Sequence, residues 1–255
     1  MSDGLDVEHD VVIVFAKVPI AGEVKTRLTP PLSEAQAAAL YTAFMADTAL
    51  TVARYGAQSS RPLVKVVAVA GDSVAASAHA AFAPFVDAGF VFLDQGEGNL
   101  GERLRRISGL CLEQGAARVV VIGTDSPTLH VDHIEFAFTL LSAHDVVLGP
   151  SFDGGYYLIG LRQMVVDGPV AHEVVFENIA WSTGDVLAQT WERCKSASLL
   201  CELMGFWYDV DTFEDVKMLR FHLLKYLKER DSELAPNTVQ LLDAWQLDGA
   251  FGLSG

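Results

Sequence analysis

The chain has 255 residues, of which 51% are hydrophobic, and its 18 Lys+Arg against 33 Asp+Glu give a formal net charge of -15. This length and composition can bury the core of one large domain, so we expect a single domain over 1–255, with 1–10 flexible and C-terminal helices over 213–255. The acidic balance argues against a nucleic acid as partner, because nucleic-acid backbones require a cationic surface. The acidic start and the short apolar runs predict no membrane span and a cytoplasmic protein.

Strands and helices are predicted to alternate along the chain. Runs rich in Val and Ile predict strands at 11–16, 63–70, 90–94, 118–123, 145–150 and 156–161, with another near 205–210. Helices are predicted at 33–55, opened by a Ser33/Gln36 capping box, and at 72–82, 101–114, 131–142 and 184–197. This order predicts an α/β fold with a mostly parallel sheet covered on both faces, which binds ligands at the carboxyl ends of its strands.

The first predicted strand is followed by a loop with three cations, Lys17, Lys25 and Arg27, in an otherwise acidic chain. Gly22 allows the backbone of this loop to approach a ligand closely. Lysines and arginines in a loop are most often solvated surface, and the loop matches neither a P-loop nor a dinucleotide-binding turn. A bound phosphate is the functional interpretation of this cluster.

Aspartates follow several of the later strands. Asp125 lies in G-T-D-S-P after 118–123, Asp153 lies in S-F-D-G-G before 156–161, and Asp209 and Asp211 lie in Y-D-V-D-T. Each could instead form a turn or cap a helix. Carboxylates that converge opposite a cationic loop suit a phosphorylated ligand bridged to the protein by Mg²⁺ or Mn²⁺, because these metals prefer oxygen ligands. This arrangement indicates chemistry in which a phosphate departs.

Five segments carry a resemblance to a known family: F-A-K-V-P-I-A-G-E-V-K-T-R-L, G-T-D-S-P, G-P-S-F-D-G-G-Y-Y-L-I-G-L, A-W-S-T and Y-D-V-D-T-F-E-D. From about 11 to 220 the chain resembles a bacterial family with the glycosyltransferase-A fold, described as nucleotide-diphospho-sugar or glycosyl transferases. Some members are associated with arsenosugar biosynthesis. The family is similar to the guanylyltransferases of molybdenum cofactor and of phospholactate.

The resemblance implies roles for individual residues. Asp125 and Asp211 would bind the metal, with Asp209 as the alternative, and Asp153 would orient sugar hydroxyls or act as a base. Asp125 is followed by Ser126 and Pro127, whereas glycosyltransferases of this fold commonly carry D-x-D. The implied nucleotide and phosphate contacts are Ala16, Lys17, Gly22, Lys25, Arg27, Gln95, Gly101 and Arg103. The implied substrate contacts are Gly154, Gly155 and Tyr156, together with Ser182 and Thr183, which could instead cap a helix.

Three functions follow, in order of preference. The first is metal-dependent transfer of a sugar from a nucleoside diphosphate sugar to a small-molecule acceptor. The second is nucleotidyl transfer, in which a phosphorylated small molecule attacks a nucleoside triphosphate and pyrophosphate leaves. The third is a nucleotide-binding module without catalysis. The sequence leaves open the base, the sugar, the acceptor and the oligomeric state, a homodimer included.

Overall fold

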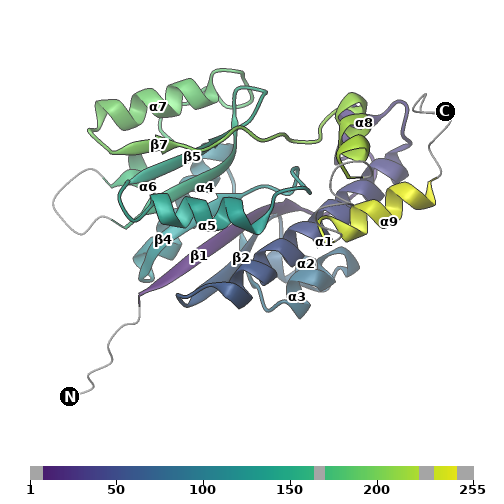
Figure 1. Cartoon of the computed structure of the whole chain (residues 1–255), viewed down its shortest axis with the longest axis horizontal. Coiled ribbons are helices and arrows are strands. Elements are labelled where there is room, and N and C mark those ends of the chain that lie inside the picture. The colour runs from purple at the N-terminus through teal and green to yellow at the C-terminus, as the bar shows by residue number, and fades with distance from the viewer. Residues whose placement is uncertain (1–7, 164–169, 224–232, 246–255) are drawn as a thin grey trace, which may run out of the picture.

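The protein is an α/β structure built on one seven-stranded sheet (Figure 1). The computed structural model describes residues 8–163, 170–223 and 233–245. The strand order is β3-β2-β1-β4-β6-β5-β7, and all neighbours are parallel except β6, which is antiparallel to both β4 and β5. The strands are β1 (His9–Lys17), β2 (Leu63–Ala70), β3 (Val91–Asp94), β4 (Ala116–Ile122), β5 (Val146–Pro150), β6 (Tyr156–Arg162) and β7 (Cys201–Leu203). The predicted mostly parallel sheet is confirmed.

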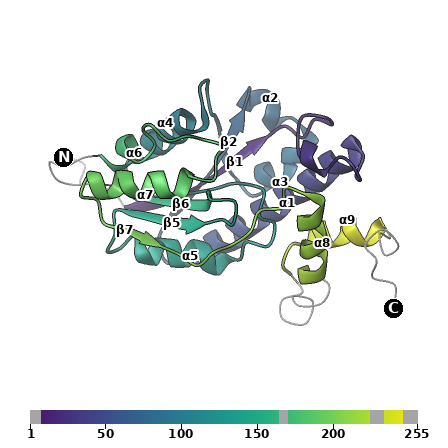
Figure 2. The same ribbon diagram turned by 90° about the horizontal axis from the view of Figure 1, so that it is seen from above.

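Helices cover both faces of this sheet (Figure 2). One face is covered by α1 (Glu34–Gln58), α2 (Ser73–Ser77), η2 (Ala80–Phe82), α3 (Ala83–Asp87) and α5 (Val131–Leu140). The other face is covered by α4 (Leu100–Glu113), α6 (Ala171–Val174) and α7 (Val186–Ser196). Because strand residues alternate between faces, Val12 and Val14 of β1 join the first core cluster, whereas Ile13 and Phe15 contact the second.

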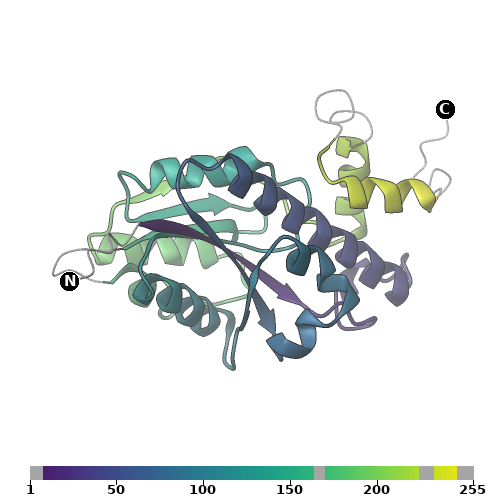
Figure 3. The ribbon, with the colours of Figure 1, turned by 90° about the horizontal axis from the view of Figure 1, so that it is seen from below.

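A third apolar cluster links the C-terminal helices to the loop after β1. Helices α8 (Phe213–Phe221) and α9 (Pro236–Ala244) lie beside α1 at one end of the molecule (Figures 1 and 3). Leu28, from the short helix η1 (Thr26–Leu28), packs in this cluster with Phe44 of α1 and with Val216 of α8. The cluster therefore fixes the first loop against the C-terminal part of the chain.

Two predicted elements differ from the structure. The strand predicted near 205–210 is wrong: β7 lies earlier, and 205–210 contributes only an isolated bridge between Trp207 and Ser151. This segment instead crosses the strand ends, where the Val210 amide donates to the Asp125 carbonyl over 2.8 Å. The single helix predicted at 72–82 is also wrong, because His79 is extended and caps a separate short helix, η2.

The helix start predicted at Ser33 is confirmed. Ser33 and Gln36 form the reciprocal capping box, and α1 extends to Gln58. The flexible start expected over 1–10 falls largely outside the described residues, as do 224–232 and 246–255 of the expected C-terminal helices. None of the described helices is both long and apolar enough to cross a membrane.

Candidate functional site

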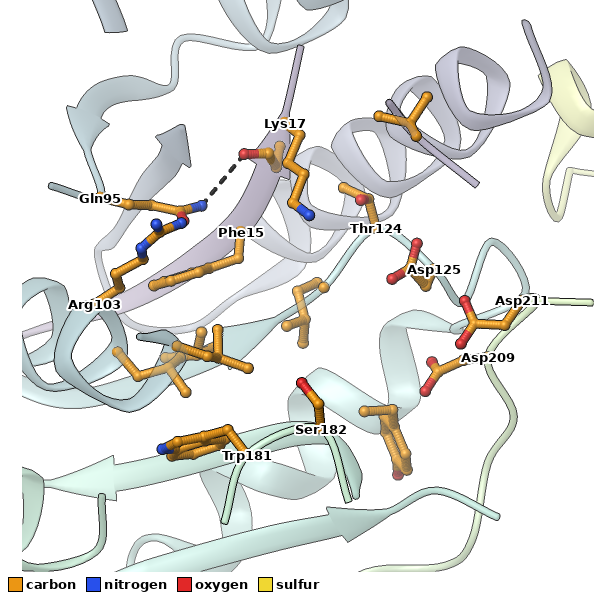
Figure 4. A pocket seen from close by; sticks show the side chains of 18 of the residues that line it. Phe15, Lys17, Gln95, Arg103, Thr124, Asp125, Trp181, Ser182, Asp209 and Asp211 are labelled. Carbon is orange, nitrogen blue, oxygen red and sulfur yellow. Dashed lines mark hydrogen bonds between the residues drawn. The ribbon is translucent and has the colours of Figure 1, made fainter. Parts of the chain in front are cut away.

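A cleft of about 880 Å³ opens at the carboxyl ends of β1 and β4 (Figure 4). This is the position at which open α/β sheets bind ligands. The predicted site residues that line the cleft are Ala16, Lys17, Lys25, Arg27, Gln95, Arg103, Asp125, Tyr156, Ser182, Asp209 and Asp211. One cavity thus gathers residues from the first loop, from the end of β4 and from the segment before α8.

Lys25 connects the acidic residues of the cleft. Its ammonium lies 2.5 Å from the Asp125 Oδ1 and 2.9 Å from the Asp211 Oδ1, and it donates to the Val210 carbonyl over 2.8 Å. The side chain is only 5% exposed. Lys25 reaches this position from a left-handed backbone conformation, with φ 48°, at the residue that precedes η1.

The charges around Lys25 and Asp211 shift the pKa values of these two groups. Burial by itself would lower the pKa of the Lys25 ammonium, but the neighbouring Asp125 and Asp211 carboxylates outweigh burial and raise it. Burial would likewise raise the pKa of Asp211, but Lys25 and Arg27 lower it below its usual value. Arg27, which is largely exposed, pairs with the second oxygen of Asp211. Lys25 is therefore cationic and Asp211 anionic at neutral pH.

Asp209 lies in a different environment from Asp211. Its carboxylate accepts a hydrogen bond from the Ser126 hydroxyl over 2.5 Å. Burial, together with the negative charges of Asp125, Asp211 and Asp153, raises the pKa of Asp209 to about 6, although the Ser126 hydrogen bond opposes this shift. The raised pKa of Asp209 therefore reflects its burial first and the neighbouring negative charges second.

The carboxylates of the cleft have the chemistry to bind a divalent metal, but they are not arranged around a common metal position. Asp125, Asp209 and Asp211 supply the carboxylate oxygens that Mg²⁺ and Mn²⁺ prefer. However, Lys25 already lies between Asp125 and Asp211. Within the described residues, no group of three or more His, Cys, Asp or Glu side chains is arranged to hold a metal ion.

Tyr41 of α1 joins two strand ends beneath the cleft and was not anticipated from the sequence. Its hydroxyl accepts hydrogen bonds from the Lys17 amide over 3.0 Å and from the Thr124 hydroxyl over 2.9 Å. Burial, followed by the nearby Asp125 charge, raises the pKa of this phenol. The position gives no signal in the sequence, because a tyrosine among the apolar residues of a helix is typical of core packing.

Gln95 connects separate segments at the edge of the cleft. Its amide nitrogen donates to the carbonyls of Ala16 and Ala68 over 3.3 and 2.9 Å, and its amide oxygen lies 3.4 Å from the guanidinium of Arg103. Arg103 also donates to the Gly98 carbonyl over 2.9 Å. The side chain of Gln95 therefore ties the loop after β3 to the end of β1.

Two predicted glycines lie outside the lining of the cleft. At Gly22, which has φ 84°, an added Cβ would lie 3.2 Å from the Glu34 carboxylate. At Gly101, an added Cβ would lie 2.4 Å from the Trp181 indole nitrogen. Gly101 thus allows α4 to lie directly against Trp181, whose ring lines the cleft.

The D-G-G segment and Thr183 also lie outside this lining. The exposed Asp153 carboxylate accepts from the Ser151 hydroxyl and, over 3.0 Å, from the Gly155 amide, so it stabilises its own turn. Gly154 has φ 87°, and an added Cβ would lie 2.1 Å from the Gly184 carbonyl. The Thr183 hydroxyl donates to the Ala180 carbonyl over 2.7 Å. The contacts of Asp153, Gly154 and Thr183 therefore stabilise local turns.

Comparisons with other proteins give a family and a fold. The family model described as "Uncharacterized protein conserved in bacteria (DUF2064)" matches residues 52–183. A "putative nucleotide-diphospho-sugar transferase" from Desulfovibrio desulfuricans G20 is 30% identical, with a TM-score of 0.78 over 95% of this chain and 96% of that one. No curated protein matches the sequence.

More distant solved structures share the fold. A cytidylyltransferase from Leptospira borgpetersenii serovar Hardjo-bovis is 10% identical, with a TM-score of 0.53 over 96% of each chain. A 4-diphosphocytidyl-2C-methyl-D-erythritol synthase from Anaerococcus prevotii DSM 20548 is also 10% identical, with a TM-score of 0.53 over 86% of this chain and 98% of that one. The expected nucleotide-diphospho-sugar transferase-like fold is confirmed.

Proposed function

The chain belongs to the DUF2064 family, and on that premise we propose that it is a transferase that acts on a nucleotide-activated substrate. The observation that carries this proposal is the charge arrangement of the cleft. Lys17, Lys25 and Arg27 line it together with Asp125 and Asp211, at the carboxyl ends of the strands. The relative described as a nucleotide-diphospho-sugar transferase, which spans nearly the whole chain, supports the same substrate class.

Each group has a defined task in this proposal. Lys25 and Arg27, with Lys17, bind the phosphates of the nucleotide and stabilise the negative charge on the departing group. Asp125 and Asp211 would hold Mg²⁺ or Mn²⁺, with Asp209 as the alternative ligand, and such a metal supplies positive charge to phosphate oxygens. A phosphate and a cation would together replace the internal Lys25 ion pairs with Asp125 and Asp211.

The first candidate reaction is transfer of a sugar from a nucleoside diphosphate sugar to an acceptor. The relative from Desulfovibrio desulfuricans G20 supports this candidate through its description. Glycosyl transfer to a hydroxyl benefits from a base that removes the proton of the acceptor. Asp153, the base implied by the resemblance, accepts hydrogen bonds within its own turn and would have to release the Ser151 hydroxyl to take this role.

Nucleotidyl transfer is the second candidate, and the position of Asp153 favours it. Asp153 lies outside the lining of the cleft, whereas Lys17, Lys25 and Arg27 lie within it. An attacking phosphate is already ionised and needs no base. This reaction therefore requires only the groups that the cleft brings together.

A thermal-shift panel tests the proposal. The protein is heated with nucleoside diphosphates, nucleoside triphosphates and nucleotide sugars, each with and without Mg²⁺ or Mn²⁺, because a ligand that binds only the folded state raises Tm. A metal-dependent shift with one nucleotide sugar supports glycosyl transfer, and a preference for one triphosphate supports nucleotidyl transfer. If no nucleotide changes Tm, the proposal is wrong.

A product assay then separates the reactions. Incubation with the preferred nucleotide and candidate phosphorylated acceptors releases pyrophosphate only in nucleotidyl transfer. Glycosyl transfer instead releases a nucleoside diphosphate. If neither product forms and nucleotide binding survives both Asp125→Asn and Asp211→Asn, the nucleotide-binding module without catalysis is the better description.

A further inference from the structure

The Lys25 ammonium is surrounded by oxygen atoms in the cleft. It lies within 2.9 Å of three of them, which are Oδ1 of Asp125, Oδ1 of Asp211 and the carbonyl of Val210. Figure 4 shows the two aspartates beside each other. An ammonium has three N–H donors, so these contacts leave none for a further ligand. Carboxylate and carbonyl oxygens are also the ligands that suit Mg²⁺ and Mn²⁺. Lys25 thus uses the oxygen atoms that a divalent metal would need.

Lys25 and a metal would compete for these oxygens. The side chain of Lys25 is only 5% exposed, so water screens its charge weakly. A divalent cation bound to the same carboxylates would lie close to the ammonium, and the two positive charges would repel each other. Asp125 and Asp211 can therefore hold one of these two cations at a time.

The ammonium of Lys25 can move while the backbone that carries it stays in place. Val24 packs in the first core cluster and Leu28 in the third, so the chain is fixed on both sides of Lys25. The four-carbon stem of a lysine, by contrast, is flexible. Lys25 lines the same cleft as Lys17 and Arg27. A phosphate bound among these cations would give the ammonium an anionic partner in place of the carboxylates.

We propose that Lys25 makes metal binding conditional on nucleotide binding. Without a phosphate, its ammonium holds Asp125 and Asp211 and excludes a divalent metal from them. A nucleotide phosphate draws the ammonium away, and the two carboxylates then become available to the metal. This inference rests on the proposed function, to which it adds a rule of binding: the metal does not bind ahead of the nucleotide.

Binding of Mn²⁺ to the nucleotide-free protein tests this exclusion. A nucleotide chelates Mn²⁺ in solution, so the decisive comparison contains no nucleotide. Electron paramagnetic resonance measures the free hydrated ion and thereby the bound fraction. We expect Lys25→Met to bind Mn²⁺ at least about tenfold more tightly than the wild-type protein, because coupling between two ligands commonly amounts to about 5- to 150-fold. Mn²⁺ alone should also raise the Tm of Lys25→Met and leave the Tm of the wild-type protein unchanged.

Arg27→Met is the matched control, because it removes the same charge from the same cleft. Arg27 also pairs with Asp211, but its side chain is largely exposed, so we expect the Mn²⁺ affinity to change less than about threefold. Addition of Asp211→Asn to Lys25→Met should return Mn²⁺ binding to the wild-type level, which assigns the metal to the cleft and not to the acidic surface. If Lys25→Met fails to fold, Lys25→Gln replaces it, because glutamine keeps a hydrogen-bond donor for the Val210 carbonyl.

The outcomes separate this inference from the proposed function. If nucleotides raise Tm but Lys25→Met binds Mn²⁺ no better than the wild-type protein or than Arg27→Met, the inference is wrong and the proposed function stands. Tight Mn²⁺ binding to the nucleotide-free wild-type protein, lost in Asp125→Asn, would show that a metal binds beside Lys25 and would also overturn the inference. If Lys25→Met gains Mn²⁺ binding as expected and no nucleotide binds, the exclusion of metal by Lys25 stands and the proposed function fails.

Discussion

Lys25 and Asp211 are 186 positions apart in the sequence, yet the Lys25 ammonium donates to the Asp211 carboxylate over 2.9 Å. The contact forms because Leu28, just after Lys25, packs with Val210 and Val216 in the apolar cluster beneath α8. The first loop and the segment before α8 therefore form one unit. The ammonium of Lys25, at 5% exposure, depends on its carboxylate partners for stabilisation of its charge.

Replacement of Lys25 by methionine should destabilise the ligand-free protein. The change leaves the Asp125 and Asp211 carboxylates without their common cation, and breaking a buried ion pair costs about 3–5 kcal/mol. Because Asp125 is 45% exposed and water partly screens it, we expect a smaller loss of about 1–3 kcal/mol in the free energy of unfolding. Urea denaturation measures this loss.

Arg27→Met is the control for this variant. Arg27 also pairs with Asp211, but it is 68% exposed, and exposed ion pairs contribute about 0–1 kcal/mol. Both variants should weaken binding of a nucleotide that the wild-type protein binds. Equal stability losses in the two variants would contradict the central position assigned to Lys25.

Asp125→Asn should reduce turnover much more than nucleotide affinity. The substitution keeps the size of the side chain but removes the charge that would hold a metal near the departing phosphate. We expect kcat to fall at least about 100-fold, the scale of losing one electrostatic contact in a transition state. Asp132→Asn, at an exposed helix start outside the cleft, is the control and should keep the wild-type rate. An unchanged rate in Asp125→Asn would remove Asp125 from the mechanism.

Local sequence signals predicted most of the sheet and several of the charged residues that line the cleft. The sequence predicts the Val/Ile runs of β1 and β4 and the cations of the first loop, because periodicity and charge are local properties. It does not predict which residues join distant segments. Tyr41 bonds to Thr124, and Trp181 contacts Gly101, only because the fold brings separate elements together.

The segment before α8 shows the same limit. Apolar and acidic residues alternate from Tyr208 to Asp211 as in a strand, but the backbone follows the ends of the sheet and bonds to the loop that carries Asp125. An alternating pattern of apolar and polar residues indicates which side chains are buried, but it does not indicate which strand the backbone pairs with. The aspartates at 209 and 211 were therefore predicted from their chemistry and line the cleft, although the strand assigned to them was wrong.

Asp47→Ala should loosen the C-terminal helix. Asp47 of α1 is 1% exposed and accepts from the amides of Asn237 and Thr238, each over 2.9 Å, and from the Thr238 hydroxyl over 2.6 Å. Losing this carboxylate leaves the first turn of α9 without its cap, so we expect a loss of about 1–3 kcal/mol in the free energy of unfolding. Amide hydrogen exchange should accelerate over 236–244. Asp243→Ala, on the exposed side of the same helix, should change neither quantity.

The half-buried imidazole of His133 should make the protein less stable as the pH falls below about 6.5. His133 packs against Trp207, with ring centroids 4.5 Å apart, and burial lowers its pKa below 6.5, although the backbone hydrogen bond with His130 and the Asp132 charge oppose this shift. Below about pH 6.5, the unfolded chain therefore binds a proton at this histidine that the folded chain does not bind. Each such proton lowers the free energy of unfolding by up to about 1.4 kcal/mol per pH unit. Asp209 acts in the opposite direction, because a carboxyl pKa raised to about 6 makes stability fall as the pH rises toward that value.

Comparison of His133→Gln with the wild-type protein isolates the histidine: between pH 6.5 and 5 the variant should lose less of its free energy of unfolding. An equal slope in the variant and the wild-type protein would show that His133 takes up its proton in the folded state.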